Sequence, residues 1–249
     1  MDFGSRAGCG DRACRGGRSE PGGTQACARS TRVDTGPGNH QPVPHGATRA
    51  ARTGGRSRAA LVRWLASSVS RFLYFVRHGQ YQPDPEGGRL TTLGRKQARH
   101  TARRLAMLPV ASLVSSDLGR AKETAAIIAA ALPGLRVRQT ALLREAMPTG
   151  YPGQKVPLVT RAEHKARIDE IVDRRLRPSR RDRIELVVCH GNLIRSLVCR
   201  VLSVRVTAWR DFDTFHCGIT QIVVKPDGRT MVASYNDTGH LPHGLITTS

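Results

Sequence analysis

Residues 72–80, FLYFVRHGQ, begin as an apolar run and end in an arginine, a histidine and a glycine. Aromatic and β-branched residues in such a run are typical of a buried strand. A second run of this kind, IELVVCH at residues 184–190, also ends in a histidine and is followed by Gly191. A glycine in this position lets the main chain turn sharply and come close to a bound anion. The chain therefore carries two expected strands that each end in a titratable side chain.

Helix-like and strand-like stretches alternate around these two runs. The spacing of apolar residues predicts helices and short strands in turn, and Thr91 or Thr92 can cap the first helix. A hairpin is predicted at residues 218–235, and Gly134 marks a helix end. The expected helices are residues 90–108, 118–132, 160–176 and 191–202, and the further strands are 111–116 and 135–140. This order predicts an α/β fold, a three-layer sandwich in which a mostly parallel sheet has helices on both faces.

Composition divides the chain of 249 residues into two parts. Residues 1–70 are rich in Gly, Arg, Ala, Ser, Thr and Pro, and contain too few large apolar residues to offset chain entropy. We predict a disordered, low-complexity tail at residues 1–70 and a folded domain at 71–249. Of the net charge of +21, the tail carries +7 and the domain +14. Such a field favours anionic partners, namely phosphorylated molecules, nucleic acid or acidic lipid, without choosing between them.

Neither the apolar runs nor the cysteines indicate a membrane or secreted protein. No run approaches the ~20 apolar residues of a membrane span, and the N-terminus lacks the apolar core of a secretory signal. The six cysteines show no zinc-type spacing: Cys9, Cys14, Cys27, Cys189, Cys199 and Cys217. We expect Cys189 and Cys199 to be buried thiols in a reducing compartment. The expected location is the cytoplasm, with the mitochondrion left open if the organism is a eukaryote.

Two histidines and an arginine are expected to meet at one edge of the sheet. Ligands of parallel sheets collect beyond the carboxyl ends of the strands, where helix N-termini offer free N–H groups. Arg77 and His78 stand at the end of one strand and His190 at the end of another. Their matching positions favour a shared cleft over isolated structural roles.

A third strand end adds another cation. In LVSSDLGRAKETA, Arg120 lies about one turn into the helix that follows, and Ser115 and Ser116 are candidate caps. A phosphoryl group suits such a site, because guanidinium groups pair with two of its oxygens at once.

Six short motifs in order resemble one family. RHG after a strand, LTTLGRKQA, VSSDLGRAKETA, LLREA, VVCHGNLIR and YNDTGHLP are similar to the histidine phosphatase superfamily, also called the phosphoglycerate-mutase-like family. The resemblance covers residues 72–241. Within the family, the chain is most similar to the branch of the mitochondrial serine/threonine protein phosphatase.

The resemblance implies roles for five residues. His78 would be the nucleophile that forms a phosphohistidine, while Arg77, Arg120 and His190 bind the phosphoryl oxygens. Glu145, in LLREA, would protonate the leaving oxygen and then activate water. The chemistry agrees, because a neutral imidazole is a competent nucleophile near neutral pH. The family requires neither a metal nor another cofactor.

We therefore expect a metal-independent phosphomonoester hydrolase, acting on phosphoserine and phosphothreonine proteins or on small phosphometabolites. A phosphoglycerate mutase is the first alternative. Mutases of the family continue after RHG with Glu-Ser and a nearby Asn, whereas this chain continues with QYQPDPEGG. The short segment MPTGYPGQKVP at residues 147–157 also suits a phosphatase, which must admit water.

The second alternative is a non-catalytic basic protein that binds nucleic acid or serves as a scaffold. Aromatic residues make up only 4% of the chain, so no stacking platform is evident, and no nucleic-acid module is present. No nucleic-acid partner is therefore expected, and a homodimer is left open. Trp209, Asp211 and His216 receive no role in the site from the sequence.

Overall fold

The computed structural model describes residues 70–151, 153 and 155–248. The predicted tail, apart from Ser70, lies outside these residues. The helices are α2 (Thr92–Leu105), α3 (Gly119–Ala130), α4 (Leu158–Arg175) and α5 (Gly191–Val201). The main strands are β1 (Arg71–Arg77), β4 (Val110–Ser116), β5 (Val137–Thr140), β6 (Arg183–Cys189), β7 (Ile219–Val224) and β8 (Thr230–Asp237). Short elements complete the set: β2 (Tyr81–Gln82), β3 (Arg89–Leu90), η1 (Ala141–Leu143), η2 (Val206–Asp211) and η3 (His243–Leu245).

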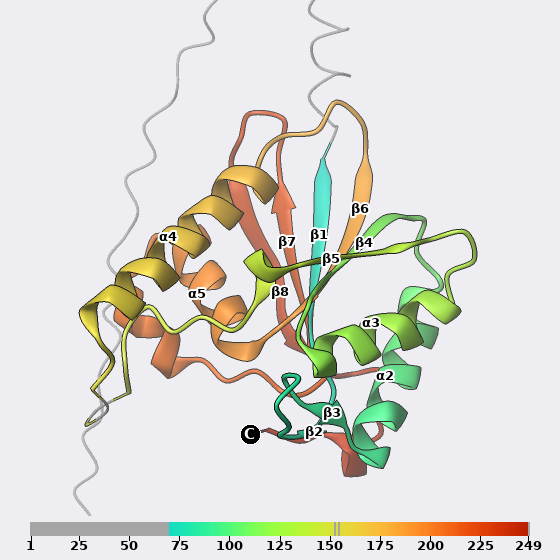
Figure 1. Ribbon diagram of the computed structural model, residues 1–249. Coiled ribbons are helices and arrows are strands. Elements are labelled where there is room, and N and C mark those ends of the chain that lie inside the picture. The colour runs from blue at the N-terminus through green and yellow to red at the C-terminus, as the bar shows by residue number, and fades with distance from the viewer. Residues whose placement is uncertain (1–69, 152, 154, 249) are drawn as a thin grey trace, which may run out of the picture. The chain divides into compact units, whose positions relative to one another are not determined.

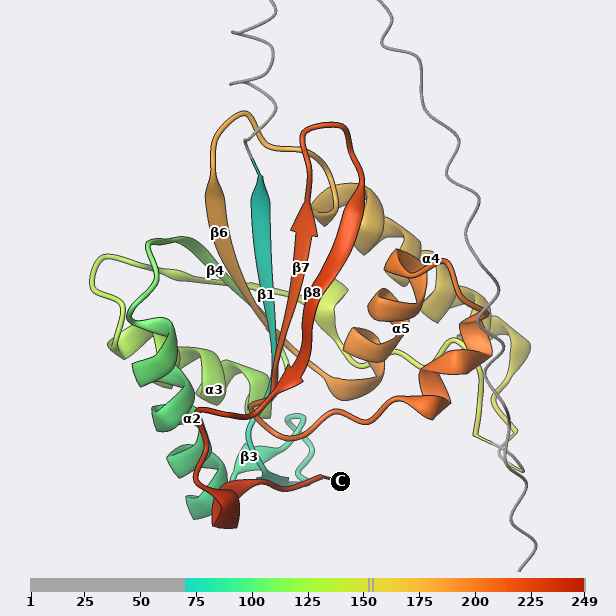
Figure 2. The ribbon, with the colours of Figure 1, turned by 180° about the vertical axis from the view of Figure 1, so that it is seen from behind.

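The main strands of the described domain form a six-stranded sheet in the order β5-β4-β6-β1-β7-β8, and β2 and β3 form a separate two-stranded sheet. Neighbours from β5 to β1 are parallel, whereas β7 is antiparallel to both β1 and β8. Helices α2 and α3 cover one face of the sheet, and α4 and α5 cover the other (Figures 1 and 2). The predicted α/β sandwich, with a mostly parallel sheet between helices, is confirmed.

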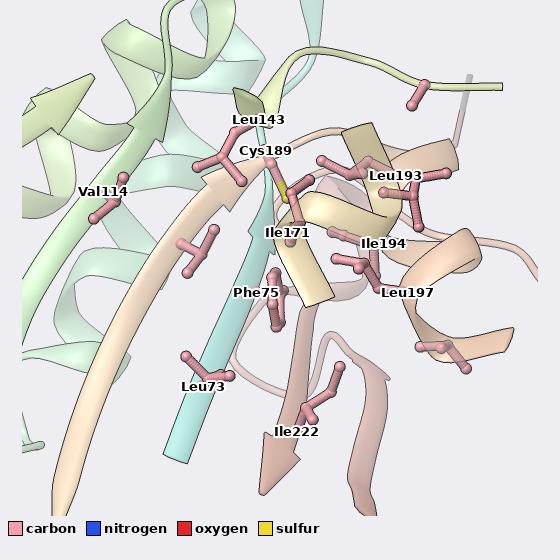
Figure 3. Close-up of a cluster of buried hydrophobic side chains, with 14 of the residues drawn as sticks. Leu73, Phe75, Val114, Leu143, Ile171, Cys189, Leu193, Ile194, Leu197 and Ile222 are labelled. Atoms are coloured by element: carbon pink, nitrogen blue, oxygen red, sulfur yellow. The ribbon is translucent and has the colours of Figure 1, made fainter. Parts of the chain in front are cut away.

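Alternate residues of β1 supply the two cores. Phe75 packs on the face covered by α4 and α5, together with Leu193 and Leu197 of α5 (Figure 3). Val76, the next residue, belongs to the core on the opposite face with Leu105 of α2. This alternation follows from the two-residue period of a strand that is buried on both sides. It also determines that Arg77 and His78 emerge at the end of the strand on opposite faces of the sheet.

The loop after β1 is held close to α2. Thr91 caps α2, as predicted, by accepting a hydrogen bond from the Gly94 N–H at 3.0 Å. A Cβ atom at Gly94 would stand 2.0 Å from the carbonyl oxygen of Gln80, so only glycine allows this approach. The small β2–β3 hairpin that follows was not predicted, because strands of two residues carry no periodic signal.

The end of the chain returns to the carboxyl edge of β1. Figure 1 shows the C-terminal residues beside the β2–β3 hairpin. The Gln97 side chain of α2 donates to the Leu245 carbonyl at 2.7 Å and to the Thr247 hydroxyl at 2.8 Å. The last described residues therefore take part in the surroundings of the strand end.

Two further expectations concern the cysteines and the membrane. Cys189 and Cys199 are free, buried thiols, as predicted, and Cys217 is a third. The remaining three cysteines lie outside the described residues.

Among the helices of the described domain, none combines the length and apolar character needed to cross a membrane.

Candidate active site

The two histidines lie side by side because their strands are neighbours in register. Arg77 pairs with Cys189 in the parallel ladder, so His78 and His190 leave the sheet at the same level. Their ring centroids are 5.0 Å apart, and the His78 N–H donates to the Cys189 carbonyl at 3.0 Å. Both side chains are buried. The strand ends therefore meet as expected from the sequence.

One main-chain oxygen determines the tautomer of His78. Its Nδ1 lies 2.9 Å from the Gly79 carbonyl oxygen. A carbonyl can only accept, so Nδ1 carries the proton and Nε2 keeps its lone pair. The guanidinium of Arg120 donates its Nε–H to that lone pair at 3.0 Å. His78 thus presents a directed, unprotonated nitrogen on the side of Arg120.

The surroundings keep His78 neutral. Burial lowers its pKa well below the ordinary value of 6.5, and the nearby His190, Arg120 and Arg77 lower it further. The hydrogen bond to the Gly79 carbonyl opposes this effect. Near neutral pH the imidazole is therefore unprotonated, which is the form that can act as a nucleophile.

Arg120 is the second residue of α3, at the carboxyl edge of β4. Besides His78, its guanidinium donates through Nη1 to the Gly87 carbonyl in the β2–β3 loop. It also lies over the ring of Tyr81, 4.6 Å from the centroid. Tyr81 in turn meets the His78 ring edge to face at 5.1 Å. The unpredicted hairpin thus holds Arg120 beside the nucleophile.

His190 is held from the neighbouring strand. Its Nε2 lies 2.9 Å from the hydroxyl of Ser116, the last residue of β4. Burial lowers the pKa of His190 well below its ordinary value, and Arg120 and Arg77 add to the effect. The prediction that Ser115 or Ser116 caps α3 was wrong: Leu118 occupies the N-cap position and makes no side-chain cap hydrogen bond. The Ser116 hydroxyl accepts a hydrogen bond from the Leu118 N–H at 3.3 Å, just before the helix, and also contacts the buried histidine.

Glu145 follows η1 and is held by the N-terminus of α5. One carboxylate oxygen accepts hydrogen bonds from the N–H groups of Ala146 and Leu193, both at 3.1 Å. Burial raises the pKa of Glu145, while these two hydrogen bonds and the charges of Arg77 and Arg120 partly offset the increase. A carboxyl group with a raised pKa can donate a proton and take it back.

Arg77 is 5% exposed and lies beside the start of α5, where a Cβ atom at Gly191 would stand 3.3 Å from its Nε. Its Nη1 donates to the Thr214 carbonyl, and burial lowers its pKa. All five predicted site residues thus sit at one edge of the sheet, around His78. In the part of the chain that the structure describes, no three His, Cys, Asp or Glu side chains are grouped to hold a metal. Metal-independent chemistry stays a prediction.

Sequence analysis missed several neighbours of the site. The ring of His216 lies 5.8 Å from that of His78, and its Nδ1 is 3.0 Å from the Thr247 hydroxyl. Burial lowers the pKa of His216 to about 3. Only the position of β7, antiparallel beside β1, brings His216 here, and the sequence gives no sign of that pairing. Trp209 is buried against Tyr151 instead, and Asp211 is exposed.

An α/β sheet with two histidines and two arginines at its carboxyl edge is the arrangement of a phosphoryl-transfer enzyme. The profile of the histidine phosphatase superfamily (branch 1) matches residues 73–162 and 148–238. The chain belongs to this superfamily.

Curated relatives and solved structures indicate which members of the superfamily this chain resembles. The mitochondrial serine/threonine-protein phosphatase Pgam5 of Caenorhabditis briggsae is 34% identical over 198 residues, covering 75% of this chain and 70% of that protein. The human protein of the same name is 34% identical over 196 residues, covering 74% and 68%. Among solved structures, a phosphoglycerate mutase from Plasmodium falciparum is 29% identical, with a TM-score of 0.52 and coverage of 70% and 96%. A mycobacterial glucosyl-3-phosphoglycerate phosphatase, 24% identical, shares the fold with a TM-score of 0.54 and coverage of 68% and 100%.

These similarities confirm that the chain is a phosphatase of the histidine phosphatase class, and they favour this function over the mutase alternative. They lend no support to a non-catalytic basic protein. The relatives are named as mitochondrial, which keeps that location open, and nothing here supports the cytoplasmic expectation.

Proposed function

We propose that this phosphatase hydrolyses phosphomonoesters through a phosphohistidine on Nε2 of His78. The observation that carries the proposal is the fixed tautomer, in which Gly79 holds Nδ1–H and leaves the Nε2 lone pair directed at Arg120. The lone pair attacks phosphorus and the bond to the leaving oxygen breaks, while protonated Glu145 gives its proton to that oxygen. Glu145 then takes a proton from water, the resulting hydroxide attacks phosphorus, and the bond to His78 breaks to release phosphate.

Arg77, Arg120 and His190 would hold the phosphoryl oxygens during both steps. The Nε–H of Arg120, now donated to His78, would pass to a phosphoryl oxygen when the substrate enters. His190 supports this role, because its buried Nδ1 has no hydrogen-bond partner among the described residues. Fixed hydrogen-bond donors, of which the two arginines are cationic, stabilise the charge of the transition state and need no rearrangement during the reaction.

Phosphoserine and phosphothreonine proteins are the proposed substrates. Support comes from the curated relatives, which are named as serine/threonine-protein phosphatases, and from the basic character of the domain. Small phosphometabolites are the alternative substrate class. Hydrolysis of phosphoserine peptides would be compared with that of 3-phosphoglycerate, and isomerisation of the latter would support the mutase instead.

The decisive experiment replaces the nucleophile. In the presence of a chelator, the full-length protein should hydrolyse p-nitrophenyl phosphate, and His78→Ala should lose about 10³-fold or more in kcat. Radiolabel from a phosphate donor should appear on histidine in the wild type and not in the variant. His100→Ala on α2 is the matched control and should behave as wild type. Equal activity of His78→Ala and wild type, or a loss restored only by added metal, would contradict the mechanism.

Glu145→Gln tests the proton donor separately. Its kcat on a phosphoserine peptide should fall by about 10²–10⁴-fold. The phosphorylation step with p-nitrophenyl phosphate should suffer much less, because p-nitrophenolate leaves without needing a proton. Equal losses with both substrates in single-turnover labelling would exclude Glu145 as the proton donor.

A homodimer is checked by light scattering of the purified protein, and a mitochondrial location by fractionation of the source cells.

A further inference from the structure

A third arginine, besides Arg77 and Arg120, lies next to the proposed phosphate site and is held by neighbouring side chains. Arg195, on α5, is 8% exposed, and its three nitrogens all donate hydrogen bonds. Nε donates to the Thr214 hydroxyl at 3.1 Å, Nη1 to the Tyr151 hydroxyl at 3.2 Å and Nη2 to Asp213 at 3.2 Å. A buried guanidinium is tolerated only with acceptors of this kind. Three of its five N–H groups are therefore directed at protein acceptors, which favours a role that it exerts through these neighbours.

Thr214 is the neighbour that Arg195 shares with Arg77. Its carbonyl oxygen accepts from Nη1 of Arg77, and its hydroxyl accepts from Nε of Arg195. Its own N–H donates to Asp213 at 2.7 Å, and the residue is 1% exposed. Two arginines are therefore fixed by two different groups of one buried residue, so a shift of Thr214 would redirect the guanidinium of Arg77.

Packing leaves little room for Thr214 to move on its other side. Gly191 begins α5, and a Cβ atom there would stand 2.9 Å from the Thr214 hydroxyl and 3.3 Å from Nε of Arg77. The helix N-terminus thus presses against both residues. The hydrogen bond from Nε of Arg195 to the Thr214 hydroxyl restricts the position of Thr214 further.

Arg77 and Arg195 are both cationic and repel each other, and the negative charge of Asp213 offsets part of this repulsion. Burial lowers the pKa of Arg77 and the charge of Arg195 lowers it further, whereas the charges of Glu145 and Asp213 raise it. Two cations close together in a low-dielectric site repel each other unless an anion lies nearby. Asp213 supplies that anion on the side of Arg195, 3.2 Å from its Nη2. Asp213 therefore offsets part of the repulsion between the two guanidinium groups.

We propose that Arg195 is a positioning residue, which holds Thr214 in place so that the Thr214 carbonyl directs the guanidinium of Arg77 at the phosphoryl group. This inference rests on the proposed role of Arg77 in phosphate binding. It assigns Arg195 no contact with the substrate. It also links Tyr151, which follows Gly150 in the loop after Glu145, to the phosphate site, because the Tyr151 hydroxyl accepts one of the three hydrogen bonds.

Two substitutions separate the proposed hydrogen bonds from the charge. Arg195→Lys keeps the charge and loses the planar fork, and Thr214→Val keeps the carbonyl and the shape but loses the hydroxyl. In the full-length protein, each should weaken inhibition by vanadate by about tenfold, the loss expected for one misdirected charge-assisted hydrogen bond. The kcat should fall with little change in KM. Arg200→Lys, which replaces an exposed arginine on the same helix, should change neither value.

A double-mutant cycle shows whether Arg195 acts through Arg77. In an Arg77→Lys background, the further change Arg195→Lys should have almost no additional effect on the dissociation constant for vanadate. A tenfold effect in both backgrounds would mean a structural role that is independent of Arg77, and would overturn the proposal. If Arg195→Lys does not fold, as judged by circular dichroism, Thr214→Val decides in the same way.

The outcomes also distinguish this inference from the proposed function. Wild-type values for both variants, together with activity that depends on His78 and Arg77, would refute the positioning role alone. Turnover that does not depend on His78 would refute the proposed mechanism whatever the Arg195 variants do.

Discussion

His78 presents a nucleophile whose protonation state is determined by its surroundings. Because burial and neighbouring cations lower its pKa below 6.5, the lone pair is lost only as the pH falls through that lowered value. After correction for ionisation of the substrate, the acidic limb of kcat/KM should therefore lie below pH 6.5. This limb should persist in Glu145→Gln, since it reports the free nucleophile. If the acidic limb of kcat/KM lies at or above pH 6.5 and is absent in Glu145→Gln, a group other than His78 limits the reaction.

Gly94 shows how tertiary contact overrides local preference. Alanine is favoured over glycine within a helix by about 1 kcal/mol, so Gly94→Ala should stabilise α2 taken alone. In the folded chain its Cβ would meet the Gln80 carbonyl, 2.0 Å away, in the loop that follows His78. We expect a net loss of a few kcal/mol, roughly 2 or more, in the free energy of unfolding, with lower activity. Denaturant-induced unfolding measures this free energy. Gly244→Ala is the control, because the added Cβ atom would meet nothing within 4 Å.

At the scale of elements, β1 and β6 are joined at their first residues by a buried ion cluster. Glu185 of β6 is buried and pairs with Arg71 of β1 at 2.9 Å, as well as with Arg183 at 2.9 Å and Arg175 at 3.7 Å. Glu185→Gln leaves these arginines without their anion, so unfolding should become easier by roughly 3 kcal/mol. Lys165→Ala, which breaks an exposed pair on α4, should cost less than about 1 kcal/mol. Equal, small effects of both changes in denaturant titrations would contradict this account.

Elements with a clear period were predictable from the sequence, and the contacts between them were not. The strand ends at His78 and His190 and the cap at Thr91 follow from local pattern. Ser116 was predicted to cap α3 because serine often does so, yet Leu118 is the N-cap residue, and the Ser116 hydroxyl contacts both the Leu118 N–H and a buried histidine after another strand. His216 reaches the site only through sheet pairing. Rules based on neighbouring residues in the sequence cannot predict which distant residue will contact a polar side chain such as the Ser116 hydroxyl.

The whole molecule carries a strong positive charge, divided between the tail and the domain. If the site binds phosphoproteins, association should be steered by this field, so KM for an acidic phosphopeptide should rise with salt while kcat stays constant. A neutral phosphoserine peptide is the control and should show a weaker dependence. Deletion of residues 1–69 should leave turnover unchanged, because all the proposed site residues lie in the described domain. Loss of both turnover and salt dependence on deletion would favour a binding role for the tail.

The anchoring of Thr247 between Gln97 and His216 has a consequence for biosynthesis. Synthesis proceeds from the N-terminus, so the nucleophile leaves the ribosome long before the residues that close its surroundings. The nascent domain can form its sheet as β8 emerges, but the site is complete only after this last segment has followed. A chain that stops before Thr247 should therefore form the sheet without a complete site, and circular dichroism together with phosphatase activity of such a truncated protein would show this.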